Sequence, residues 1–114
     1  MISFACKNIE LKDLVMCSFE LNKTDYKLFN FLIKKKKYLS INEISEEMKL
    51  ERTTIQKSLK RLFEKNIVLR LQKNIDSGGY MFVYKIKDKE LIKNIMKEMV
   101  SEWYKKVKIE IEAW

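Results

Sequence analysis

The sequence predicts a mainly α-helical α+β fold with one small β-hairpin, built as a single domain over residues 1–114. The chain has no Pro and only two Gly, the adjacent Gly78 and Gly79, so helix-interrupting residues are scarce in a sequence rich in Lys, Leu, Ile and Glu. Apolar residues recur mostly at helical spacing and alternate only beside the glycine pair. A length of 114 residues leaves room for one domain with one core.

Two helices are predicted before residue 37. The first helix spans residues 9–20, and Cys17 is expected on its apolar surface. The segment 22–24 separates it from the second helix. Thr24 is the predicted N-cap of the second helix, and Asp25 lies in its first turn, where the helix dipole favours an anion. The second helix runs to about Lys36 and ends in a run of four lysines at 34–37.

Two further helices follow in close succession. Ser40 and Glu43 have the spacing of a capping box, in which the N-cap residue and the third helical residue exchange side-chain bonds with the backbone. They predict a helix over residues 41–48. A tight connection leads into a helix over residues 52–65, ended by Asn66. Its apolar residues form one stripe: Ile55, Leu59, Leu62 and Phe63.

A hairpin and a long helix complete the chain. Strands are predicted over residues 67–72 and 80–86, joined by the polar turn 73–79. A helix of about 36 Å follows over residues 88–112. The order of elements makes residues 21–87 a helix-turn-helix with a wing, preceded by an N-terminal helix within 1–20 and followed by a long C-terminal helix within 88–114.

The positive charge is concentrated in the middle of the chain. The net charge is +8, and residues 21–87 hold sixteen of the 24 basic side chains but only seven of the 16 acidic ones. The helix over 41–48 carries three glutamates and no base, whereas the helix over 52–65 carries five bases and one glutamate. Such a separation suits a recognition helix, which enters a groove flanked by phosphates, and indicates double-stranded DNA as the partner.

We therefore expect helix 52–65 to enter the major groove and hairpin 67–86 to act as a wing. The residue types able to read base edges are Arg52, Thr53, Thr54, Gln56, Lys57 and Arg61. Phosphate contacts are expected from Ser40, Lys60, Arg70, Lys73 and Lys85. The alternatives are an ordinary solvated amphipathic helix, a hairpin that only covers the core, and a lysine run that is a solvated helix end.

Three segments, 21–26, 38–48 and 50–68, resemble the MarR- and TrmB-type winged-helix transcriptional regulators. The resemblance covers about residues 21–86 and implies a winged-helix fold, sequence-specific duplex DNA binding and usually a homodimer. Glu51 stands where the family pattern usually has Ser or Pro, and Asn66 stands where it usually has Gly. The MarR-type wing tip carries an Asp/Arg pair, of which this chain has only Asp76.

The C-terminal helix predicts a homodimer. Its apolar residues occupy an arc of about 200° at 100° per residue, wider than one core-facing stripe needs. We expect this arc and the N-terminal helix to form the dimer interface through Leu11, Leu14, Ile92, Met96, Met99, Trp103, Val107 and Ile111. A helix that packs fully on its own domain is the alternative. A two-fold dimer would read a pseudo-palindrome with half-sites about 34 Å apart.

Several function classes are disfavoured by what the chain lacks. It has no His, no evident nucleophile–base pair and no carboxylate dyad, so we expect neither an enzyme nor a metal site or cofactor. Two cysteines, Cys6 and Cys17, the lack of an apolar run of about 20 residues and the lack of a signal-peptide pattern favour a cytoplasmic protein without a membrane partner. A protein-binding winged helix and a regulator that responds to a small molecule remain alternatives, and the sequence names no effector.

Overall fold

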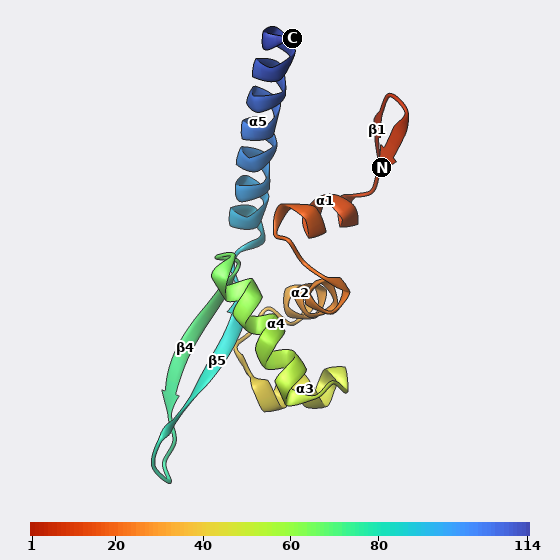
Figure 1. Ribbon diagram of the computed structural model, residues 1–114. Coiled ribbons are helices and arrows are strands. Elements are labelled where there is room, and N and C mark those ends of the chain that lie inside the picture. The colour runs from red at the N-terminus through yellow and green to blue at the C-terminus, as the bar shows by residue number, and fades with distance from the viewer.

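The computed structural model describes all residues, 1–114, as five helices and two small antiparallel sheets (Figure 1). The strands are β1 (Ile2–Phe4), β2 (Lys7–Ile9), β3 (Leu39–Ser40), β4 (Val68–Asn74) and β5 (Tyr80–Ile86). The helices are α1 (Leu11–Ser18), α2 (Lys23–Lys35), α3 (Ile41–Met48), α4 (Arg52–Glu64) and α5 (Lys89–Ala113). The molecule is elongated, 65 × 23 × 22 Å, because the body lies at one end and α5 projects from it.

The winged-helix-like body is made by α2, α3, α4 and the three-stranded sheet. The sheet has the order β3-β5-β4 with both pairs antiparallel. The predicted hairpin is confirmed, with its first strand extending to Asn74. The short strand β3, which sequence periodicity did not predict, pairs Leu39 with Tyr84 and thereby fixes the start of α3 against the sheet.

The core lies between α2, α3, α4 and the inner face of the sheet. The predicted α3 matches residues 41–48, and Ile44 is completely buried. The stripe predicted on α4 is confirmed for three residues, Ile55, Leu59 and Leu62, whereas Phe63 is 38% exposed. Phe63 lies instead at the edge of α4 that faces β4, where it takes part in a contact described below.

The N-cap of α2 is Asn22, which corrects the prediction of Thr24. The Asn22 side chain accepts the Asp25 N–H at 2.8 Å, and an Asp25 carboxylate oxygen accepts the Asn22 N–H at 3.2 Å. Because a capping box offers two such bonds and Thr24 offers at most one, the helix begins two residues earlier, at Lys23. At its other end, Lys36 adopts a left-handed conformation with φ 53° and terminates the helix.

The N-terminal segment differs from its prediction. Residues 9–20 were expected to form one helix, but α1 begins only at Leu11, and β1 and β2 form a separate hairpin before it. Cys17 was expected in an apolar surface and is exposed instead. The helix starts at Leu11 because Glu10 and Asp13 form a capping box there.

Helix α5 follows the wing after two residues and is 25 residues long. Its first turns pack on the body, where Ile92 is buried and Ile95 and Met96 are partly buried. Its remaining turns extend beyond the body, past α1 (Figure 1). None of the five helices combines the length and the apolar character that a bilayer span requires.

Candidate nucleic-acid interface

Helix α4 presents a polar face to solvent on the side away from the core. Its core-facing residues are buried: Ile55, Ser58, Leu59 and Leu62. The opposite face carries Arg52, Thr53, Gln56, Lys57 and Lys60, which are all exposed, and Thr54 at its margin is half-buried. Neither Lys57 nor Lys60 forms an ion pair within the chain. Five of the six predicted base-reading residues thus share or border one accessible surface.

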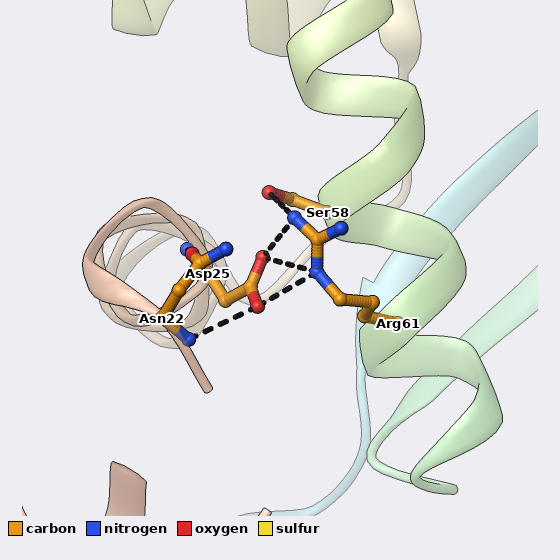
Figure 2. A network of polar contacts seen from close by, with 4 residues as sticks. All are labelled: Asn22, Asp25, Ser58 and Arg61. Atoms are coloured by element: carbon orange, nitrogen blue, oxygen red, sulfur yellow. Dashed lines mark hydrogen bonds and ion pairs between the residues drawn. The ribbon is translucent and has the colours of Figure 1, made fainter. Parts of the chain in front are cut away.

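Arg61, the sixth, is engaged elsewhere, which corrects its prediction as a base-reading residue. Its Nε and Nη2 donate to the carboxylate of Asp25 on α2, at 2.8 Å for each closest contact, and Nη2 also donates to Ser58 at 3.3 Å (Figure 2). Asp25 is completely buried, and its ion-pair partner within the chain is the Arg61 guanidinium. Arg61 lies on the α2-facing side of α4 and joins the two helices.

The ion pair shifts the pKa of both partners. Burial by itself would raise the pKa of Asp25, but hydrogen bonds from Arg61, Ser58 and the Asn22 backbone, together with the charge of Arg61, outweigh it. The pKa of Asp25 is therefore lowered from its ordinary 3.8. The hydrogen bonds to Asp25 raise the pKa of Arg61. Both groups stay charged at neutral pH, and α4 is fixed on α2 by a bidentate contact.

Ser40 is also occupied, which corrects its prediction as a phosphate contact. It is buried and serves as the N-cap of α3, where its hydroxyl accepts the Glu43 N–H at 3.2 Å. The Glu43 carboxylate accepts the Ser40 N–H at 3.1 Å. This bond, with the one from the Ser40 hydroxyl, lowers the pKa of Glu43. The capping box predicted from the sequence is confirmed, and it holds the serine away from solvent.

The three wing residues predicted to contact phosphates, Arg70, Lys73 and Lys85, have different surroundings. Lys73 is exposed on β4, and the Lys85 ammonium lies 5.6 Å from the centre of the Tyr38 ring. The Arg70 guanidinium contacts two aromatic rings, 4.6 Å from the centre of Phe63 on α4 and 4.5 Å from that of Phe82 on β5. These cation–π contacts position Arg70, which is exposed and forms no ion pair within the chain, beside α4.

The contacts of Arg70 with Phe63 and Phe82 are not predicted by the sequence pattern. Helical spacing predicts Phe63 as a core residue, and the alternation of its strand predicts nothing specific for Phe82. A signal was present in the register: Arg70 stands beside Gln72 on β4, and Gln72 pairs with Phe82. Same-face neighbours one pair apart on adjacent strands are within reach of long side chains.

In the lysine run 34–37, one lysine forms an ion pair and the other three are exposed to solvent. Lys35 donates to Glu47 of α3 at 2.8 Å, so it joins α2 to α3. Lys34, Lys36 and Lys37 are exposed at the end of α2. The run therefore is a solvated helix end for the most part, with one interhelical ion pair.

The residues predicted for a dimer interface fall into two groups. Ile92 is buried in the core of its own chain and Met96 packs against it, so Ile92 is not available to a partner; this corrects the prediction. It is buried because the first turns of α5 close the body. The others remain accessible: Leu11, Met99, Trp103 and Ile111 are exposed, and Leu14 and Val107 are half-buried.

Comparison with known proteins places the chain in a family. Residues 11–107 match the family described as the DnaD N-terminal domain. Two uncharacterized proteins of Methanocaldococcus jannaschii are 33% and 29% identical, over 94% and 90% of this chain and 80% and 83% of their own lengths. The matched family differs in name from the MarR- and TrmB-type regulators, so the relation to those two families stays a prediction.

Two solved structures share the fold. A protein of Methanosarcina mazei Go1, described as a "possible transcriptional regulator", superposes with a TM-score of 0.93 at 35% identity, over 100% of this chain and 96% of that one. The ST1889 protein of the thermoacidophilic archaeon Sulfolobus tokodaii superposes with a TM-score of 0.67 at 24% identity, over 90% and 94%. The α+β fold with a small wing is therefore shared, and the chain belongs to the DnaD N-terminal domain family.

Proposed function

We propose that this protein is a non-enzymatic, DNA-binding transcriptional regulator of the cytoplasm. The observation that carries the proposal is the accessible face of α4, where Arg52, Gln56, Lys57 and Lys60 are exposed and the two lysines have no acidic partner. A helix that reads DNA needs this combination of unpaired cations and hydrogen-bonding side chains. Likeness to a protein described as a possible transcriptional regulator supports the regulatory role.

The wing supports the same surface. Arg70, Lys73 and Lys85 follow α4 in the chain, and Arg70 touches Phe63 of α4 itself. With α4 in the major groove, the edge of the Arg70 guanidinium is suited to a phosphate of the backbone that flanks the groove. Base reading is assigned to Arg52, Thr53, Thr54, Gln56 and Lys57, and phosphate binding to Lys60, Arg70, Lys73 and Lys85.

We further propose that the protein works as a two-fold homodimer through α5. Beyond the body, α5 exposes Val100, Trp103, Tyr104 and Ile111 by 43–63%, together with Met99 by 42%. Large exposed apolar surfaces of this kind mark protein interfaces. An isologous pair of α5 helices would cover the side that carries Val100, Tyr104 and Ile111, next to Met99 and Trp103, and would present two α4 helices to a pseudo-palindromic site.

The test is a titration of duplex DNA from the upstream region of the protein's own operon at several salt concentrations. We expect log K to fall linearly with log salt, with a slope of about −0.9 per phosphate neutralised. The variant K57A/K60A should bind more weakly and lower the slope by about one, because Lys60 is assigned to a phosphate and Lys57 to a base. The matched control is K105A/K108A on α5, which removes the same charge far from α4 and should leave the slope unchanged.

The same titration separates the alternatives. A winged helix that binds only protein would give no salt-dependent affinity for duplex DNA, in the wild type as in both variants. A regulator that needs a small molecule would bind DNA in the same way, and its affinity would change when the effector is added. Equal slopes for the wild type and K57A/K60A would contradict the assignment of α4.

A further inference from the structure

The β1–β2 hairpin has one apolar and one polar face. The register pairs Ile2 with Ile9 and Phe4 with Lys7, so these four side chains share one face. Ser3 pairs with Asn8 on the other face, where the Ser3 hydroxyl donates to the Asn8 side chain at 2.9 Å. An amphipathic pattern of this kind indicates a hairpin built to lie on another surface.

That apolar face is uncovered within the chain. Ile2 is 49% and Phe4 67% exposed, and neither belongs to the hydrophobic core. Each strand has three residues, and an isolated two-stranded hairpin of that size is at best marginally stable in water. The hairpin also lies before residue 11, outside the segment that matches the DnaD N-terminal domain family.

A complementary groove runs along α5. It is shallow, with a volume of about 380 Å³, and it is lined by Ile95, Met99, Trp103, Glu98, Glu102 and Lys106. Its apolar side chains match Ile2 and Phe4 in character. Glu98 forms no ion pair within the chain, and neither does Lys7, which lies beside Phe4 on the apolar face of the hairpin. The two surfaces are therefore complementary in charge as well as in hydrophobicity.

The two surfaces lie at the same end of the molecule. In Figure 1 the hairpin stands beyond α1, at the level of the part of α5 that projects from the body. Within one chain they remain apart, because the hairpin keeps its apolar face exposed. A two-fold dimer uses every contact twice, so each hairpin can cover the groove of the other chain.

We propose that the β1–β2 hairpin is an exchanged arm that binds the α5 groove of a second copy of this chain, with Phe4 against Met99 and Trp103 and Lys7 beside Glu98. This rests on the proposed homodimer and adds to it a second, separately removable contact. The arm explains why a short hairpin with an apolar face precedes α1, and it gives the free half of α5 two partners, the other α5 and the other hairpin.

The test measures the dimer dissociation constant of the full chain by sedimentation velocity. I2T/F4T removes the two exposed apolar side chains of β1 and replaces them with β-branched residues that suit strands, and it should raise the constant at least tenfold. S3T, the matched control, changes the polar face, retains the hydroxyl and should leave the constant unchanged. K7E should raise it several-fold, and K7E/E98K should restore it, because the exchanged charges would again attract.

The outcomes distinguish the arm from the dimer. A wild type that stays monomeric at all concentrations overturns both the dimer and the arm. A dimer whose constant is the same in the wild type, I2T/F4T and K7E overturns the arm and leaves the α5 dimer standing. Circular dichroism of each variant checks that the helices are intact, so that a weaker dimer is not attributed to unfolding.

Discussion

The carboxylate of Asp25 on α2 and the guanidinium of Arg61 on α4 form a bidentate ion pair, with one partner completely buried. The same carboxylate accepts the N–H of Asn22 and so also begins α2. One side chain thus fixes both the start of α2 and its packing against the helix assigned to the major groove. The pair is a positioning element for that helix, and it gives the first two predictions.

Removing Arg61 should destabilise the fold. R61A leaves a buried carboxylate without its counter-charge, and breaking a buried pair costs roughly 3–5 kcal/mol. Because 41% of the Arg61 side chain is exposed and water can partly replace it, we expect about 2–3 kcal/mol. Urea denaturation measures this as a lower midpoint at an unchanged m-value. K60A, one residue away and exposed, should cost less than about 0.5 kcal/mol; equal midpoints for R61A and the wild type would refute the role of the pair.

The pH dependence of stability should report Asp25. Its pKa is lower in the folded than in the unfolded chain, so the unfolded chain binds more protons between the two values and stability rises with pH there. The contribution is fully present above the ordinary value of 3.8 and is lost as pH falls through the lower folded value. Thermal unfolding from pH 2 to pH 7 should show a steeper acid decline for the wild type than for D25N. Parallel curves for the two proteins would exclude Asp25 as a source of the acid decline.

Replacing Ser40 should affect stability without affecting DNA contacts. S40A removes the acceptor for the Glu43 N–H at the start of α3. Loss of an N-cap typically costs about 1 kcal/mol. The salt slope of DNA binding should be the same as in the wild type, because the buried hydroxyl is not a phosphate ligand. A slope lowered by about one unit would instead reinstate Ser40 as a phosphate contact.

Arg70 should not be replaceable by lysine. R70K keeps the positive charge but loses the planar guanidinium that contacts Phe63 and Phe82. A cation–π contact of this kind is worth about 0.5–1 kcal/mol, so we expect DNA affinity to fall about two- to five-fold. The measurement is a binding titration at one fixed, low salt concentration. Lys73 is exposed and contacts no aromatic ring, so K73R is the control and should change the DNA affinity little. An equal loss of affinity in R70K and K73R would show that the ring contacts of Arg70 do not contribute to binding.

The helices of the body could be predicted because local signals agree with the packing. Ser40 and Glu43 define the start of α3 from their spacing alone, and Ile55, Leu59 and Leu62 identify the buried side of α4. The capping box and the apolar stripe are both short-range features. The fold class and the wing follow from such patterns with no knowledge of tertiary contacts.

The functional surface was less predictable, because side-chain roles depend on distant partners. Arg61 and Lys57 lie on one basic helix, but Arg61 forms an ion pair with Asp25, 36 residues away in sequence. Lys57 is exposed and forms no ion pair within the chain. Ser40 and Ile92 were assigned to outer surfaces and are buried by the sheet and the body. Composition gives the charge of a helix, whereas only the tertiary contacts determine which of its charges remain free.

The junction between the wing and α5 is held by hydrogen bonds at both connecting residues. Lys87 donates its N–H to Ile67 at 3.0 Å, and Asp88 caps α5 by accepting the Glu90 N–H. With both connecting residues tied down, α5 is a lever of about 37 Å joined to β5 without a flexible linker. The direction of α5 is therefore set by β5, the same strand that pairs with Arg70 of β4 through Tyr84.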